Sequence, residues 1–229
     1  GAARELNRLD IKNRQPAPEM LVREIARRLD QVVAECDAVI VADQVSEPEC
    51  GVITLAVRER LAELGQRYPS KILLADSRER IGLFRNVIAK PNRSECLAAI
   101  GQQGVDPGDG VAVTAATRQL ANRTGRPVYC TVGEQGILYV EQDRVETVPG
   151  FRVTGPIDIV GAGDSTTAGI VCALCAGADP IEAAAFGNLV ASITIQQIGT
   201  TGTASPEQVI ARWREINRNG TGGVRRPVP

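Results

Sequence analysis

The chain has 229 residues, of which 43% are hydrophobic and 23% charged, with 26 basic and 27 acidic side chains. This composition is typical of a globular protein with a sizeable core and excludes a disordered chain. The balanced charge, the lack of an apolar run of about 20 residues and the lack of a signal-peptide pattern together predict a cytoplasmic protein without nucleic-acid or membrane partners.

The first half of the chain alternates helical and strand patterns. A Pro-rich start leads into apolar residues at helical spacing over 16–30, and the continuous apolar run DAVIVAD follows at 37–43. The same patterns predict helices at 54–66, 94–100 and 109–123 and strands at 71–76 and 86–89. Strands that alternate with helices predict a parallel, doubly wound α/β sheet.

The second half completes the sheet and then becomes helical. A strand at 127–132 precedes two short strands at 136–140 and 145–148, which predict an antiparallel pair on the edge of the sheet. Helices are expected at 162–176, 180–195 and 205–216. Because no internal repeat or Gly/Ser-rich linker divides the chain, we expect one domain over residues 1–218 and a flexible tail at 219–229.

The chain has no histidine and six cysteines. Acid–base chemistry must therefore rest on carboxylates, lysines or thiols. The cysteines lie in apolar segments, which favours buried free thiols over a disulfide framework. Cys172 and Cys175 form a C-x-x-C pair, but without a second pair or a histidine this predicts packing rather than a metal site.

The segment that most clearly indicates chemistry is DIVGAGD at 158–164. Glycines at a strand-to-helix turn let backbone N–H groups converge on one point, and the helix dipole adds partial positive charge there. The carboxylate of Asp164 would repel an anion at this turn, so a role as general base explains it better. Alternatively, Asp164 is an N-cap and Gly-Ala-Gly a tight turn. The segment is neither a Walker A loop nor a G-x-G-x-x-G fingerprint.

This segment resembles the D-x-x-G-A-G-D signature of the ribokinase (PfkB) family of carbohydrate kinases. The resemblance implies that the backbone amides of Gly161, Ala162 and Gly163, together with that of Asp164, surround the γ-phosphate of ATP. It also implies that Asp164 takes the proton from a sugar hydroxyl during transfer.

Two further segments resemble elements of the same family, in the family's order. Asn92 and Glu95 in KPNRSE match an N-x-x-E element, which implies that they organise Mg²⁺ through water. Thr131, Gly133 and Gly136 in TVGEQG match a T-x-G-x-x-G turn beside the nucleotide phosphates and ribose. Taken singly, the two segments are also explained as a capping box and a hairpin turn.

The resemblance implies two more contacts near the end of the chain. Asn188 falls where the family places a residue beside the adenine, although alone it could be a polar residue on a helix face. A monovalent cation, K⁺, is implied near Asp158 and the carbonyl of Val160, with the loop at 199–203 on its other side. The sequence gives no independent sign of this cation.

The resemblance extends from about residue 9 to residue 216 and implies a ribokinase-like three-layer α/β/α fold. Its sheet would be mostly parallel with an antiparallel edge. Family members begin with further strands that carry a sugar-binding Gly-Gly signature and a lid, and this sequence shows neither. We therefore expect a fold that lacks the N-terminal strands and the lid. Family members often pair through that lid, so a homodimer stays open.

The start of the chain resembles one branch of the family, the heptose-phosphate kinases of ADP-heptose synthesis. That branch has D-Y-G-K-G where this chain has Asp43 followed by Gln44, Val45 and Ser46, so a basic residue for an anionic sugar phosphate is missing. Asp43 is equally explained as a strand-end cap. We expect an ATP-dependent sugar kinase whose sugar is not identified. The alternatives are an inactive nucleotide-binding or regulatory remnant of the same fold and, disfavoured by the missing glycine fingerprint, a nicotinamide dehydrogenase.

Overall fold

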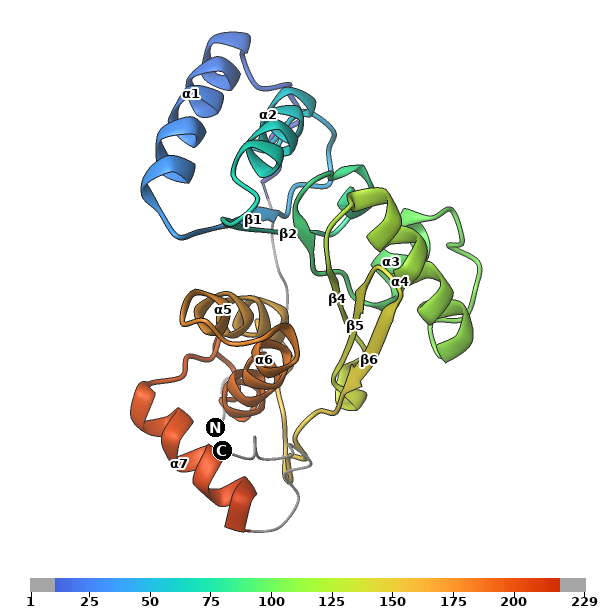
Figure 1. Ribbon diagram of the computed structural model, residues 1–229, viewed down its shortest axis with the longest axis vertical. Helices are drawn as coiled ribbons and strands as arrows, with labels where there is room; N and C mark the ends of the chain where they lie inside the picture. The colour runs from blue at the N-terminus through green and yellow to red at the C-terminus, as the bar shows by residue number, and fades with distance from the viewer. Residues whose placement is uncertain (1–10, 219–229) are drawn as a thin grey trace.

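The computed structural model describes residues 11–218, which form a six-stranded sheet with helices on both faces (Figure 1). The four parallel strands are β1 (Ala38–Asp43), β2 (Ile72–Ser77), β3 (Ile88–Ala89) and β4 (Val128–Thr131). The antiparallel strands β5 (Ile137–Glu141) and β6 (Arg144–Val148) complete the sheet. This confirms the expected α/β fold with a mostly parallel sheet and an antiparallel edge. The tail predicted at 219–229 lies outside the described residues.

The helices form two layers. One face of the sheet packs against α1 (Glu19–Glu35), α2 (Leu55–Arg67), α3 (Arg93–Ala99) and α4 (Gly110–Thr124). The other face packs against α5 (Ala162–Cys175) and α6 (Pro180–Thr194), and α7 (Pro206–Arg218) packs against α6. Two short 3₁₀ turns, η1 (Ile81–Leu83) and η2 (Gly133–Gln135), lie in the connections.

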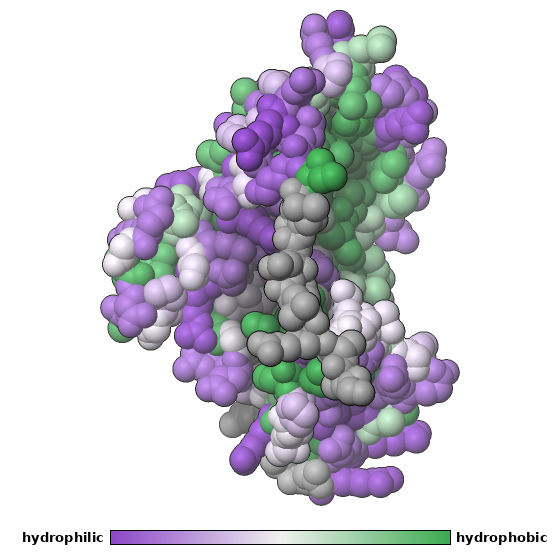
Figure 2. All heavy atoms as spheres, turned by 180° about the vertical axis from the view of Figure 1, so that it is seen from behind, coloured by the Kyte–Doolittle hydropathy of each residue, from purple (hydrophilic) through white to green (hydrophobic). Residues whose placement is uncertain are grey.

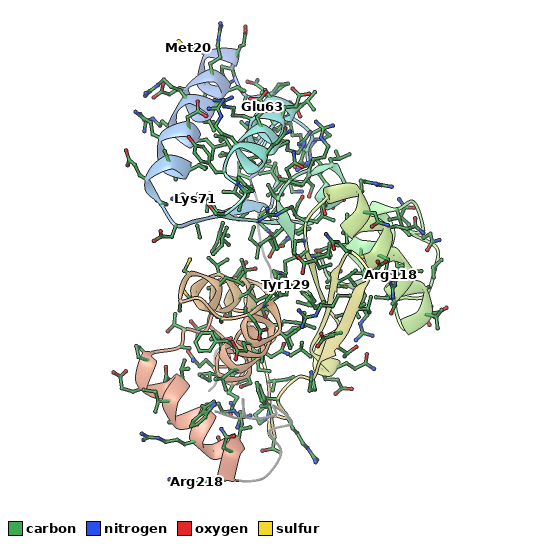
Figure 3. All side chains as sticks on the ribbon, in the orientation of Figure 1. Met20, Glu63, Lys71, Arg118, Tyr129 and Arg218 are labelled. Carbon is green, nitrogen blue, oxygen red and sulfur yellow. The ribbon has the colours of Figure 1, made fainter. Side chains whose placement is uncertain are left out.

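Alternation along the strands separates two cores. Successive side chains of a strand point to opposite faces, so Leu73 and Ala75 join the core beneath α1 to α4 whereas Leu74 joins the core beneath α5 and α6. Tyr129 belongs to the second core and lies between the sheet and the α5–α6 pair (Figure 3), with its ring centroid 5.0 Å from that of Tyr139.

The prediction of a doubly wound sheet needs a correction. A doubly wound sheet reverses its strand order at a switch point, but the described strands follow one another in chain order from β1 to β6. Right-handed crossovers that all move in one direction place their helices on the same face. The opposite face is covered by α5 and α6, which come after the last strand in the chain.

Three element boundaries differ from the sequence-based expectation. Helix α1 continues to Glu35 because Val33, fully buried, extends its apolar face. Strand β3 shrinks to two residues because Asn86, where the strand was predicted to begin, has a left-handed φ of 58°. Helix α7 includes Asn217 and Arg218, which the sequence placed in the frayed tail.

The cysteines are all free, but fewer are buried than predicted. Cys96 and Cys130 are buried, whereas Cys36, Cys172 and Cys175 are exposed. The expectation that Cys172 and Cys175 serve packing is therefore wrong, because the pair lies on the outer side of α5.

The outer edge of the sheet is β1, which among the described strands pairs with β2 alone. Seen from behind, hydrophobic surface extends over the part of the molecule where α1 lies (Figure 2). Exposed apolar side chains in this part include Met20, Leu21, Val32 and Ile40. Within residues 11–218, none of the helices combines the length and apolarity required to cross a bilayer.

Candidate functional site

The DIVGAGD segment ends in the first turn of α5, as the sequence predicts. Gly161 is the N-cap, with φ of 78°, and a Cβ there would lie 2.8 Å from Thr201 Cγ2. The amide of Ala162 donates to the carbonyl of Ile159 at 3.1 Å, so it is already engaged in a turn. The amides of Gly163 and Asp164 have no acceptor within residues 11–218. Two N–H donors and the positive end of the helix dipole are therefore available to an anion.

Asp164 lies beside these donors with an unengaged carboxylate. It is exposed in the first turn of α5, and the described part of the chain offers its side chain neither a hydrogen bond nor an ion pair. Because Gly161 is the N-cap, the alternative that Asp164 caps the helix is wrong. The carboxylate is free to accept a proton from a bound hydroxyl.

A cleft of about 880 Å³ opens next to this turn. Its volume is in the range of sites that hold a nucleotide or a similar ligand. The cleft is lined by half of the sequence-predicted site residues, namely Asn92, Thr131, Gly133, Ala162, Gly163 and Asn188. The other predicted residues, Glu95, Gly136, Asp158, Val160, Gly161 and Asp164, are not part of its lining.

The sequence missed several residues that line this cleft. Arg93 follows directly after Asn92, and its guanidinium donates to the carbonyl of Val132, which places positive charge in the wall. The segment 151–153 and Ser192 also line the cleft. Ser192 lies one helical turn after Asn188, so helical spacing from Asn188 could have identified it. No comparable signal marks 151–153, which belongs to an irregular connection.

Asn92 and Glu95 form a capping box at the start of α3. The Asn92 side chain accepts from the Glu95 amide at 2.9 Å, and the Glu95 carboxylate accepts from the Asn92 amide at 2.8 Å. The simpler interpretation of this motif is therefore confirmed. Burial raises the pKa of Glu95, and the nearby Asp76 carboxylate raises this pKa further against the opposing effects of the Asn92 amide, Lys90 and Arg78.

The T-x-G-x-x-G segment connects β4 to β5, so its interpretation as a hairpin turn is also correct. The Thr131 amide donates to the carbonyl of Pro91 at 2.9 Å, which brings this turn against the start of α3. Gly136 has φ of 99°, and a Cβ there would overlap the carbonyl of Val148 and approach Pro149 C to 2.7 Å. Glycine is required because the chain leaving β6 passes directly over this position.

Asn188 connects α6 to the wall of the cleft. Its side chain is 8% exposed and donates to the carbonyls of Val148 and Pro149, each at 3.1 Å. These bonds hold the start of the segment whose next residues line the cleft. Asn188 is thus more than a polar residue on a helix face.

Asp158 holds two loops together. Its carboxylate accepts N–H groups from Val160 and Gly199, each at 3.0 Å, which brings the loop at 199–203 against the turn before α5. These two hydrogen bonds, first that of Val160 and then that of Gly199, lower the pKa of Asp158. No group of three Cys, Asp or Glu side chains within residues 11–218 is arranged to hold a metal ion directly.

We expect Asp158→Asn to lower the free energy of unfolding at pH 7, because an amide cannot accept both N–H groups. A lowered folded-state pKa stabilises the protein above the unfolded-state pKa of about 3.9, and this contribution disappears as the pH falls through the folded-state value. The difference between wild type and variant should therefore shrink below about pH 4. Urea unfolding followed by circular dichroism at several pH values measures it. A difference that stays constant from pH 7 to pH 3 would contradict this role.

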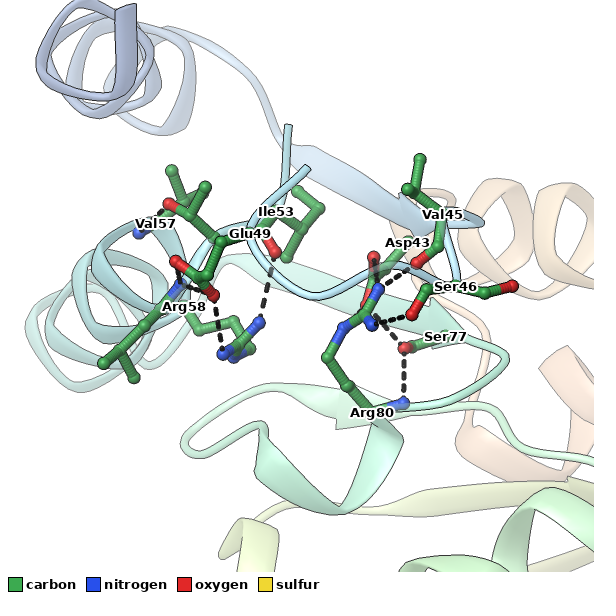
Figure 4. A network of polar contacts seen from close by, with 11 residues as sticks. Asp43, Val45, Ser46, Glu49, Ile53, Val57, Arg58, Ser77 and Arg80 are labelled. Atoms are coloured by element: carbon green, nitrogen blue, oxygen red, sulfur yellow. Dashed lines mark hydrogen bonds and ion pairs between the residues drawn. The ribbon is translucent and has the colours of Figure 1, made fainter. Parts of the chain in front are cut away.

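Asp43 is buried at the end of β1 and fully engaged (Figure 4). It accepts from Ser77 Oγ at 2.7 Å and from Arg80 Nη2 at 2.9 Å and Nε at 3.2 Å. Arg80 also donates to the carbonyls of Val45 and Ser46. The pair fixes the turn after β1, which agrees with a strand-end role for Asp43.

Comparison with known proteins places this geometry in context. A family model described as "pfkB family carbohydrate kinase" matches residues 82–208, more than half of the chain. A curated relative, "Bifunctional protein HldE" of Paramagnetospirillum magneticum, is 26% identical over 214 residues, which are 92% of this chain and 42% of the relative. The chain thus spans about two fifths of the length of this relative.

Solved structures share the fold at low sequence identity. Phosphofructokinase-2 from Escherichia coli, solved with potassium, has a TM-score of 0.68 at 20% identity, over 89% of this chain and 64% of that one. Ribokinase from Arabidopsis thaliana, solved with ribose and ATP, has a TM-score of 0.63 at 16% identity, over 86% of this chain and 59% of that one.

Proposed function

Because the chain belongs to the pfkB family of carbohydrate kinases, we propose that it transfers the γ-phosphate of ATP to a hydroxyl group of a sugar or sugar phosphate. The observation that carries this proposal is the exposed, unengaged carboxylate of Asp164 beside the free amides of Gly163 and Asp164. A base and an anion site within one helical turn are what phosphoryl transfer requires.

The cleft supports nucleotide binding in this proposal. Asn188 would lie beside the adenine, and Thr131 and Gly133 along the ribose and phosphates. Gly136 would act from behind, by letting the segment that forms the cleft wall pass close to the hairpin. Phosphoryl transfer depends mainly on in-line positioning and charge neutralisation. In this arrangement the amides at the start of α5 receive the phosphate oxygens, and Asp164 removes the proton from the acceptor hydroxyl.

Mg²⁺ and K⁺ are proposed as cofactors along with ATP. Glu95 and Asn92 would hold Mg²⁺ through water, and the half-buried Glu95, whose pKa burial raises, has a carboxylate that a cation would stabilise. Magnesium, when bound, bridges phosphate oxygens and neutralises their charge. K⁺ would lie near Asp158 and the carbonyl of Val160, where two loops already meet. The potassium in the phosphofructokinase-2 structure supports testing this ion.

A second candidate is a nucleotide-binding or regulatory protein of the same fold that lacks catalysis. The observation that favours it is the pairing of Asp43 with Arg80, since the turn after β1 then offers no free basic side chain to a sugar phosphate. Both candidates share the nucleotide cleft, so nucleotide binding alone does not separate them.

We expect ADP to form from ATP and Mg²⁺ in a way that depends on one member of a panel of pentoses, hexoses, heptoses and their phosphates. A coupled assay for ADP, with each acceptor tested against an acceptor-free control, measures this. Replacement of K⁺ by choline in the same assay tests the monovalent cation. Calorimetric binding of ATP without acceptor-dependent ADP formation over the whole panel would contradict the kinase and favour the second candidate.

A further inference from the structure

Lysine is rare in this chain, which makes one buried lysine conspicuous. Of the 26 basic residues, lysines are found at positions 12, 71 and 90 alone. Lys12 is about half exposed and pairs with Glu47, and Lys71 donates to a backbone carbonyl at the start of β2. Lys90, in contrast, is 3% exposed. A buried ammonium group is costly unless the fold supplies compensating partners, so its surroundings need an explanation.

Two side chains hold Lys90 in place at the carboxyl end of the parallel strands. Its Nζ lies 2.9 Å from Oδ2 of Asp76, near the end of β2. The same Asp76 oxygen accepts from Oγ1 of Thr167, on α5, at 3.2 Å. The Lys90 amide also donates to the carbonyl of Ala75 at 2.9 Å. The ammonium group is thus fixed between the sheet and the first turns of α5.

The ammonium group lies directly next to the proposed phosphate site. Nζ is 3.7 Å from the point where a Cβ of Gly163 would be, and the Gly163 amide is one of the two free donors of that site. An ammonium group carries three donors, whereas Asp76 is its single acceptor within the described part of the chain. Donors therefore remain for a ligand that binds at the start of α5.

We propose that Lys90 is a catalytic residue whose ammonium group contacts the γ-phosphate of ATP, with Asp76 and Thr167 as positioning residues. This inference rests on the proposed function and adds a full positive charge to the backbone amides. A lysine suits the position because its charge is compact and fits beneath a helix terminus, where the broader arginine fork would not. Charge placed where the transferring group gathers negative charge stabilises the transition state.

A purely structural ion pair would not distinguish between nucleotides, and this difference gives the test. We expect wild type to bind a non-hydrolysable ATP analogue more tightly than ADP in isothermal titration calorimetry with Mg²⁺. Lys90→Met should weaken binding of the analogue by about 10- to 100-fold, the loss expected for hydrogen bonds to a charged group, and leave ADP affinity within about twofold. Thr167→Val should reduce the preference for the analogue several-fold.

Lys90→Met alone leaves Asp76 buried without a counter-charge, so Asp76→Asn/Lys90→Met, which is neutral at both positions, carries the same test. Lys71→Met is the matched control, because Lys71 lies at the opposite end of β2, and it should keep the preference. An unchanged preference in folded Lys90→Met or in the double variant would overturn the role of Lys90, even if the wild type phosphorylates a sugar. Loss of the preference supports it, even if no sugar in the panel is phosphorylated, an outcome that contradicts the kinase function alone. Failure of the wild type to bind either nucleotide overturns both.

Discussion

We expect Asp164→Asn to lower the turnover number for sugar phosphorylation by roughly two to four orders of magnitude, the usual contribution of a general base. The amide cannot accept the proton of the attacking hydroxyl, whereas the free amides at the start of α5 remain in place. Because the Asp164 side chain makes no hydrogen bond or ion pair to residues 11–218, the substitution should leave stability nearly unchanged. Steady-state kinetics and calorimetric binding of ATP, measured on the same preparation, separate the two effects.

Asp143→Asn is a suitable control for this variant. Asp143 lies in the turn between β5 and β6, and the antiparallel pairing of β4 with β5 places that turn at the opposite edge of the sheet from Asp164. Its turnover number should match that of wild type. If Asp164→Asn retained wild-type turnover while binding ATP normally, Asp164 would not be the base, and the mechanism proposed above would fail.

The second large effect concerns stability. Gly136→Ala should lower the free energy of unfolding by about 3 kcal/mol or more, because a left-handed conformation and a backbone overlap combine at this position. The new Cβ would lie 2.7 Å from Pro149 C and would overlap the carbonyl of Val148. Relief of that overlap must move the chain leaving β6, whose next residues line the cleft, so ATP affinity should fall as well. Urea unfolding and calorimetry measure the two losses.

Gly155→Ala separates conformational strain from steric overlap. Gly155 has φ of 97°, close to the 99° of Gly136, but a Cβ there meets no atom within 4 Å. We expect this control to cost about 1 kcal/mol, the strain of a non-glycine residue with positive φ. Equal losses in the two variants would mean that the close approach of the chain leaving β6 is unimportant.

The parts of the site that the sequence could predict are those built from adjacent residues. The DIVGAGD segment places glycines, a helix start and Asp164 within one turn, so local rules suffice to recognise it. Asn92 and Glu95 show the limit of such rules. The same spacing serves a capping box, which the structure contains, and a magnesium site, which stays a prediction.

What the sequence could not show depends on the pairing of distant segments. Asp76 and Lys90 meet only because β2 and β3 pair in a particular register, and Thr167 reaches them from a helix much later in the chain. The wall formed by 151–153 depends on the irregular path of the chain after β6. The strand order was also not predictable, since alternating helices and strands are compatible with either direction of winding.

That strand order affects how the protein forms during synthesis. Each strand pairs with the one translated just before it, so the sheet can grow as the chain leaves the ribosome. The helices that cover its second face, α5 and α6, come after all six strands. Until then Leu74, Ile88, Tyr129 and Tyr139, all buried in the finished protein, remain open to water. The nascent chain should therefore bind hydrophobic-sequence chaperones most strongly just before residues 162–194 emerge, and the catalytic turn becomes ordered in the same late step.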